Sequence, residues 1–173
     1  MSCVVGLIQN GKIFLGSDSK ATTPDGERRP IKTIKVFRNK KYLIGYTGSV
    51  RAGQILQEKY FEAPDDIFEL PDAIREHLST KGTLLVNDEQ AQMQNVNLLI
   101  AYESTLYEIL ADFQLNEVSG GCTAIGTGAS YAMGSLHTTN KLMLSPEERV
   151  TAALEAACEY EITCGLPIEI QVF

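Results

Sequence analysis

Short apolar stretches separated by turn residues predict a chain rich in β-hairpins. Residues 2–9 and 12–18 are rich in β-branched and apolar residues, and Asn10-Gly11 between them is a strong type I′ turn signal. The same pattern predicts further strands at 33–37, 42–47, 95–102, 106–111, 113–118, 122–125 and 168–173. Residues 19–30 are polar and rich in proline and glycine, which predicts a loop.

Helical periodicity fills the stretches between these strands. Helices are predicted at 49–61, 71–79, 129–138 and 145–162. Ser49 is a suitable N-cap for the first, whose apolar residues from Val50 to Phe61 share one side. The last has the clearest start, because Ser145-Pro146-Glu147-Glu148 supplies an N-cap, a proline at the first position and a capping-box glutamate.

The order of these elements predicts an α+β fold. Strands are followed by two helices, more strands, two more helices and a final strand, without a repeat or a linker. Hairpins and helix pairs that are segregated in this way favour antiparallel sheets covered by helices over a doubly wound parallel sheet. The length of 173 residues fits one domain, so we expect a single domain over residues 1–173.

Composition and charge argue against several classes of partner and site. The net charge of −7 argues against a nucleic-acid or anionic-membrane partner. No apolar run is long enough to span a bilayer, and the N-terminus lacks the pattern of a secretory signal, which predicts a cytoplasmic protein. The four cysteines form no Cys-x-x-Cys pair and there are only two histidines, so neither a zinc site nor a Ser-His-Asp triad is expected.

The first two residues carry candidate chemistry. Ser2 follows Met1 directly, and an initiator methionine is commonly removed when a small residue follows it. Removal would place a free α-amine, with a pKa near ~7.7–8.0, on the same residue as a hydroxyl, and such an amine can take the hydroxyl's proton. Ser2 is therefore a candidate nucleophile, although a processed N-terminus without a catalytic role fits the same residues.

Several motifs, taken with the order of elements, resemble those of the proteasome β-subunit family and its short HslV-like bacterial branch. They are the Met-Ser start, Asn10-Gly11, Gly16-Ser17-Asp18, Lys35-Val36-Phe37, Gly45-Tyr46-Thr47-Gly48-Ser49 and Ile125-Gly126-Thr127-Gly128-Ala129. The resemblance covers nearly the whole chain. It implies the fold of N-terminal-nucleophile hydrolases, a four-layer α-β-β-α sandwich of two antiparallel sheets.

The resemblance also implies catalytic roles in the first part of the chain. Ser2 stands where the family has its nucleophile, normally threonine. Asp18 stands at the acid that holds the catalytic lysine, and Lys35 stands at that lysine. Lys32 is the competing candidate for the lysine. Without the resemblance, Asp18 would be interpreted as a turn-capping residue and Lys35 as a surface lysine.

Roles in the rest of the site follow in the same way. Gly48, to within one residue, corresponds to the turn whose amide faces the tetrahedral intermediate. Thr127 corresponds to a family serine near the α-amine, and Glu161 and Cys164 fall near an aspartate and a serine that complete this network. Glu161 also fits a solvated helix residue. Cys3 would become a nucleophile if both Met1 and Ser2 were removed, but a buried thiol is the simpler interpretation.

The activity implied is peptide-bond hydrolysis through the N-terminal Ser2, a threonine-type peptidase chemistry that needs no cofactor. The resemblance further implies self-association into rings, with active sites facing a chamber, and an AAA+ ATPase that unfolds protein substrates. Two alternatives stay open: a non-catalytic ring-forming subunit and a small-molecule amide hydrolase of the same superfamily. The substitutions at Ser2, Thr127, Glu161 and Cys164 keep the first alternative open.

Overall fold

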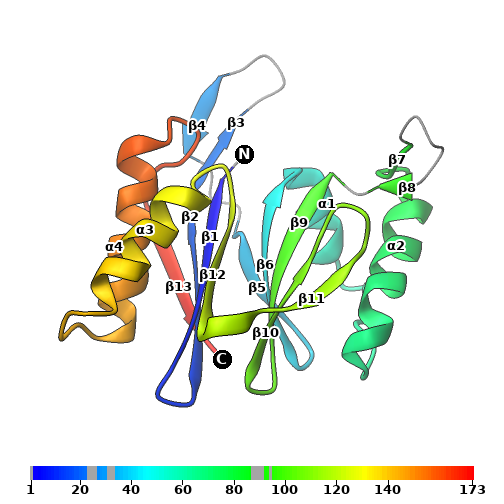
Figure 1. Ribbon diagram of the computed structural model, residues 1–173. Coiled ribbons are helices and arrows are strands. Elements are labelled where there is room, and N and C mark those ends of the chain that lie inside the picture. The colour runs from blue at the N-terminus through cyan, green and yellow to red at the C-terminus, as the bar shows by residue number, and fades with distance from the viewer. Residues whose placement is uncertain (1, 23–26, 31–33, 87–91, 94) are drawn as a thin grey trace.

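Two antiparallel sheets packed face to face form the centre of the protein, and a pair of helices covers each outer face (Figure 1). The computed structural model describes residues 2–22, 27–30, 34–86, 92–93 and 95–173. The first sheet has the order β12-β1-β2-β13 and the second has the order β11-β10-β9-β6-β5. This arrangement is the predicted α-β-β-α sandwich.

The strands of the first sheet are β1 (Cys3–Gln9), β2 (Lys12–Asp18), β12 (Cys122–Gly126) and β13 (Ile168–Val172). Those of the second are β5 (Val36–Asn39), β6 (Tyr42–Gly48), β9 (Val96–Tyr102), β10 (Thr105–Ile109) and β11 (Leu115–Glu117). Two separate ribbons pair β3 (Lys20–Thr22) with β4 (Arg28–Pro30) and β7 (Leu85–Val86) with β8 (Gln92–Met93).

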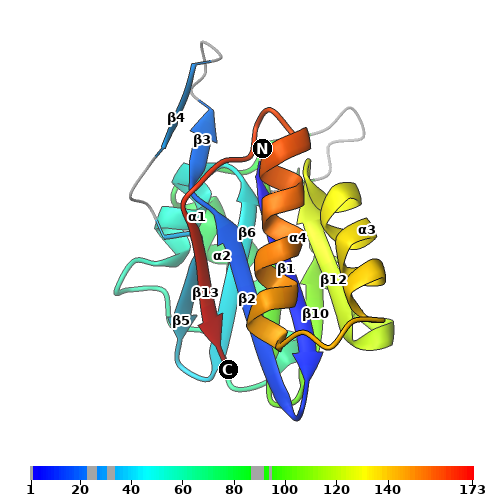
Figure 2. The ribbon, with the colours of Figure 1, turned by 90° about the vertical axis from the view of Figure 1, so that its left-hand side faces the viewer.

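The helices are α1 (Val50–Leu56), α2 (Leu70–Thr80), α3 (Ala129–Thr139) and α4 (Pro146–Tyr160), with short 3₁₀ helices η1 (Ile67–Glu69) and η2 (Ser119–Gly121). Figure 2 shows α3 and α4 lying over the first sheet. Ser145 forms the predicted capping box with Glu148, and Ser49 Oγ accepts the Ala52 amide as the predicted cap of α1.

Three clusters of buried apolar side chains hold the four structural layers together. They form because successive side chains along a strand point to opposite faces of its sheet. In β1, Val4 faces the second sheet, whereas Val5 and Leu7 face α3 and α4. In β6, Leu43 lies between the sheets, whereas Ile44 faces α1 and α2. Because both faces of these strands are covered, their sequences are continuous apolar runs rather than alternating ones.

Three details of the sequence prediction are wrong. Residues 20–22 and 28–30 form an antiparallel strand pair where a loop was expected. The backbone groups at the two ends of a polar segment can hydrogen-bond to each other even when its side chains give no strand pattern. Helix α1 ends at Leu56, so Tyr60 is 83% exposed instead of sharing a helix face with Phe61. The strand expected at 113–118 is shorter, because its ladder with β10 runs from Leu115 to Glu117.

Candidate active site

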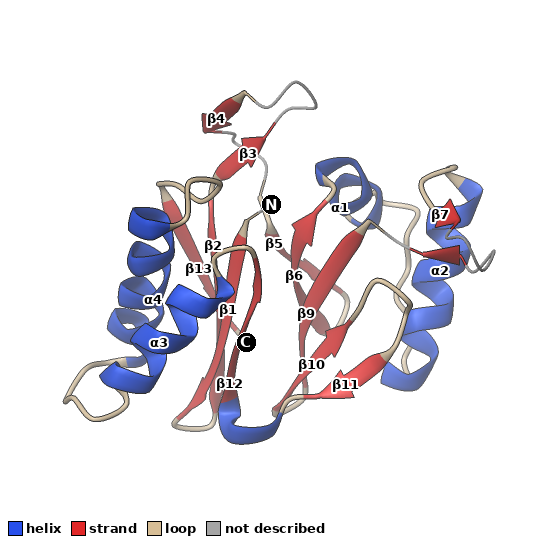
Figure 3. Ribbon diagram, turned by 45° about the horizontal axis from the view of Figure 1, so that its top comes forward, coloured by secondary structure: helices blue, strands red, loops and turns tan. Residues whose placement is uncertain are grey.

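The first sheet and the second sheet together bring Ser2, Asp18 and Lys35 to one end of the sandwich, where β1 begins (Figure 3). Strands β1 and β2 are antiparallel, with Val4 opposite Ser17, so the start of one meets the end of the other. Lys35 directly precedes β5 in the second sheet. The three side chains are at most 3% exposed, so the site lies between the sheets and is shielded from water.

Asp18 organises this site through both carboxylate oxygens. Its Oδ1 accepts hydrogen bonds from Ser2 Oγ (2.7 Å), Lys35 Nζ (2.8 Å) and Cys3 N (3.0 Å), and its Oδ2 accepts from Lys20 N (3.0 Å) and Gly165 N (3.1 Å). A buried carboxylate needs this number of donors to replace its lost hydration. Asp18 therefore joins β1, β2, Lys35 and the turn before β13, which is far more than the cap of a turn.

Lys35 uses all three of its ammonium protons. They are donated to Asp18 Oδ1, to the Lys20 carbonyl at 2.6 Å and to Ser2 Oγ. The ammonium therefore cannot turn away from Ser2 without losing a buried ion pair. A cation held against a hydroxyl oxygen stabilises the alkoxide that forms when this oxygen attacks a carbonyl. The competing candidate, Lys32, lies outside the described residues.

The carbonyl of Ser2 is fixed by the turn that follows β12. The Gly128 amide donates to it at 3.3 Å, and the Thr127 hydroxyl oxygen lies 3.3 Å from it. Gly126 has φ +98°, and a Cβ built there would lie 2.2 Å from the Ser2 carbonyl oxygen. Only glycine allows the backbone to approach Ser2 this closely.

Replacement of Gly126 by alanine is therefore expected to destabilise the protein by more than about 2 kcal/mol, because backbone strain and a clash with Ser2 combine. Gly82 is the matched control, since its φ is +66° but a Cβ there meets nothing within 4 Å. The Gly82→Ala variant should lose only about 1 kcal/mol of stability, from backbone strain alone. Urea unfolding midpoints measure both variants, and equal losses would show that the contact with Ser2 is unimportant.

A chain of hydrogen bonds leads from Thr127 to Glu161. Glu161 Oε1 accepts from the Thr163 amide (3.1 Å) and from the Thr163 hydroxyl (2.8 Å). Thr127 Oγ1 and Thr163 Oγ1 lie 2.7 Å apart. Because the only hydroxyl proton of Thr163 goes to Glu161, the hydrogen bond between the two threonines must be donated by Thr127. The lone pairs of Thr127 are then left to accept a hydrogen bond at the Ser2 end of the chain.

Thr163 is the residue that sequence reasoning missed. The resemblance placed the last member of this network at Cys164, but Cys164 packs with Cys3 among buried apolar side chains. The available signal was local: Thr163 is the only hydroxyl residue in the turn between α4 and β13 from 161 to 165. The structure also brings Glu161 into the network, half-buried at the end of α4, rather than leaving it as a freely solvated helix residue.

Replacing Thr163 by valine keeps the shape of the side chain and removes the hydroxyl. We expect the peptide hydrolysis that the resemblance implies to fall about 10- to 100-fold and its pH profile to change, since the Thr127 hydroxyl is no longer oriented. Thr163→Ser should restore activity. Thr139→Val is the control, because that buried hydroxyl donates within α3, to Ser135 O. A pH profile identical to that of the wild type would remove Thr163 from the network.

Lys20 connects the Asp18–Lys35 pair to the turn that follows α4. Its main-chain carbonyl accepts from Lys35, and its amide donates to Asp18. Its ammonium reaches across to the carbonyls of Ile162 (3.0 Å) and Cys164 (3.3 Å). Lys20 therefore links the residues around Asp18 to the turn that carries Thr163, a contact that no sequence motif indicates.

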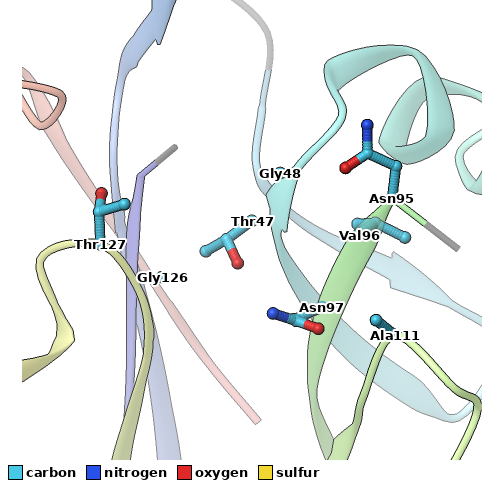
Figure 4. A pocket seen from close by; sticks show the side chains of 8 residues that line it. All are labelled: Thr47, Gly48, Asn95, Val96, Asn97, Ala111, Gly126 and Thr127. Carbon is cyan, nitrogen blue, oxygen red and sulfur yellow. The ribbon is translucent and has the colours of Figure 1, made fainter.

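A pocket of about 360 Å³ opens between the sheets (Figure 4), and one of its lining residues, Thr127, has its hydroxyl 3.3 Å from the Ser2 carbonyl. Gly126 and Thr127 line one side, and Thr47, Gly48 and Asn97 line the other. The volume falls within the range of sites for small ligands or side chains. Gly48, with φ +102°, is thus brought to the pocket but makes no described contact with Ser2.

The thiols near the site are poorly suited to act as nucleophiles. Burial raises the pKa of Cys3 far above its usual range and raises the pKa of Cys164 to about 12. Both therefore stay protonated at neutral pH, whereas the nucleophilic form is the thiolate. This favours the interpretation of Cys3 as a buried structural thiol. Within the described ranges, no group of three or more His, Cys, Asp or Glu could hold a metal ion.

Comparison with known proteins supports the fold. Neither a family model nor a curated protein sequence matches the chain. Among solved structures, Thiobacillus denitrificans BPH in complex with epoxomicin is similar at 22% identity and TM-score 0.84, covering 99% of this chain and 97% of BPH. Eukaryotic HslV from Trypanosoma brucei follows at 17% identity and TM-score 0.72, with 98% of each chain covered. Anbu, an ancestral beta-subunit from Yersinia bercovieri, is 11% identical at TM-score 0.71, over 99% of this chain and 81% of Anbu.

The chain thus has the fold of the proteasome-type N-terminal-nucleophile hydrolases, as its motifs predict. At these identities the comparison establishes the architecture. In the part of the chain that is described, no helix combines the length and apolarity needed to span a membrane.

Proposed function

We propose that this protein is a peptidase whose nucleophile is the hydroxyl of Ser2, exposed by removal of Met1. One observation carries the proposal: Ser2 Oγ is held in a buried site by both Asp18 and Lys35. A buried ion pair is a weak source of stability, since desolvation offsets most of the attraction between its charges. Its presence around a single hydroxyl is better explained by chemistry than by folding.

The first half of the reaction forms an ester. The free α-amine of Ser2, directly or through water, takes the hydroxyl proton, and Oγ attacks the substrate carbonyl carbon. The Lys35 ammonium stabilises the negative charge on Oγ as the proton leaves. The Gly48 amide donates to the tetrahedral oxyanion. When the peptide C–N bond breaks, the proton on the α-amine passes to the departing amine, which leaves an acyl-Ser2 ester.

The second half returns the enzyme to its starting state. Water attacks the ester carbonyl while the α-amine accepts a proton from it. The ester C–O bond then breaks, Ser2 regains its proton and a carboxylic acid product departs. Thr127 orients the amine by accepting one of its protons, and Glu161 and Thr163 orient Thr127. No cofactor takes part in any of these steps.

The alternative of a non-catalytic subunit is less well supported by the site. A subunit with a purely structural role gains nothing from a buried lysine whose three protons converge on Ser2, Asp18 and a carbonyl. The fold is shared with HslV and with an ancestral beta-subunit. On this basis the proposal includes self-association into rings in the cytoplasm, with unfolded polypeptides delivered by an AAA+ ATPase.

A panel of fluorogenic peptides with varied side chains before the reporter group tests the activity. The rate is expected to fall as the pH drops below the range in which an α-amine titrates, ~7.7–8.0, because a protonated amine cannot accept the hydroxyl proton. Light scattering tests the assembly in the same samples. No cleavage of any peptide by a protein that has lost Met1 would overturn the peptidase proposal.

A further inference from the structure

A second pocket, of about 220 Å³, lies at the end of the sandwich opposite Ser2. It is found where η2 leads into β12, at the lower end of the molecule in Figure 1. Polar and backbone groups on its wall come from Gly120, Gly121, His137, Asn140 and Arg149. The volume is below the ~300–1,000 Å³ of sites for drug-sized ligands, which suits a small occupant.

The unusual member of this pocket is Arg149, which lies on α4 and is only 7% exposed. Its Nη1 donates to Gln9 Oε1 (2.6 Å) and its Nη2 to the Leu136 carbonyl (3.4 Å). Its Nε has no hydrogen-bond partner among the residues that the structure describes. A guanidinium has five N–H donors, so these two bonds leave three without a described acceptor.

The described part of the chain also supplies no counter-ion for the charge of Arg149. A guanidinium stays protonated in proteins, and no ion pair found among the described residues involves Arg149. The Leu136 carbonyl in the last turn of α3 supplies the partial negative charge of a helix C-terminus, at most about half a unit. Since a buried unpaired charge is strongly unfavourable, the site as described is incomplete.

We propose that this pocket binds a small oxyanion, a phosphate or a carboxylate group, through the guanidinium of Arg149. Arginine presents its N–H groups in a planar fork that matches these anions. His137 and Asn140 are exposed on the rim, where their side-chain N–H groups can complete the shell around the anion. The two glycines, with φ of +82° and +72°, keep the opposite wall free of side chains. The site is separate from Ser2 and does not depend on the proposed peptidase activity.

Isothermal titration with inorganic phosphate, and separately with acetate, tests the proposal at an ionic strength held constant with sodium chloride. The expected result is saturable binding of at least one of these anions, at one site per chain, with a matching rise in the thermal unfolding midpoint. Arg149→Met should weaken the binding more than tenfold. Arg75→Met is the control, because that exposed arginine lies on α2, where it pairs with Asp72, and its loss should leave binding unchanged.

A second variant covers the case in which Arg149→Met does not fold. His137→Ala combined with Asn140→Ala changes two exposed side chains, so stability should be preserved while anion affinity falls several-fold. The proposal is overturned if neither anion binds beyond the effect of chloride. It is also overturned if the double variant, folded as the wild type, binds the anion with unchanged affinity.

Discussion

Replacing Ser2 by alanine is expected to lower peptide hydrolysis by a factor of at least about 10³ while the fold persists. The substitution removes Ser2 Oγ, which donates a hydrogen bond to Asp18 and accepts one from Lys35, while Lys35 and Asp18 remain paired. Steady-state kinetics with the best fluorogenic peptide measures the loss, and circular dichroism verifies the fold. The binding pocket beside Gly126 is unchanged, so inhibition by a competing uncleaved peptide should be retained.

Two further variants make this experiment specific. Ser19→Ala removes another buried hydroxyl next to Asp18 and should leave the rate near that of the wild type. Ser2→Thr keeps the nucleophile and adds the methyl group that restricts its rotamers, so its rate should equal or exceed that of the wild type. Cleavage that survives in Ser2→Ala would exclude Ser2 as the nucleophile.

Replacing Lys35 by methionine is expected to abolish activity and to destabilise the protein by about 3–5 kcal/mol. The change leaves the Asp18 carboxylate buried without its ion-pair partner, which is costlier than the loss of the pair itself. Denaturant unfolding at neutral pH measures this loss. Lys12→Met, on the exposed first residue of β2, is the control and should stay within about 0.5 kcal/mol of the wild type.

A double variant separates the stabilising role of Lys35 from its catalytic role. Adding Asp18→Asn to Lys35→Met removes the uncompensated charge, so at least about 1 kcal/mol of stability should return. Activity should not return, since the cation next to Ser2 is still missing. The contradicting result is simple additivity. If the loss of stability in the double variant equalled the sum of the losses in Lys35→Met and Asp18→Asn, the two side chains would not be coupled as the structure indicates.

Local signals predicted the elements that position the site. Asn10 and Gly11 both have positive φ, as a type I′ turn requires, and this turn fixes the register that brings the end of β2 to Ser2. Ser145 starts α4 as its capping box predicts, and the end of α4 delivers Glu161. In each case the determining interactions lie within a few residues of one another, which is why the sequence alone reveals them.

Contacts between distant segments could not be predicted from such local signals. The bond from Lys20 to the Ile162 carbonyl has no local signature. Thr163 is the only hydroxyl residue from 161 to 165, but its bond to Thr127 joins segments 36 residues apart. In a turn, the direction of each side chain depends on backbone angles that the sequence leaves open. Arg149 is a further example, because no motif in the sequence indicates that its buried charge lacks a partner among the described residues.

The central claim is that Ser2 carries a free amine and a reactive hydroxyl. Intact mass spectrometry of the purified protein, before and after incubation with a sulfonyl fluoride that reacts with activated serine hydroxyls, tests it most directly. We predict a chain without Met1 that gains one sulfonyl group per subunit, located on Ser2 by peptide mapping and absent in Ser2→Ala. A chain that keeps Met1 and gains no adduct would contradict the account.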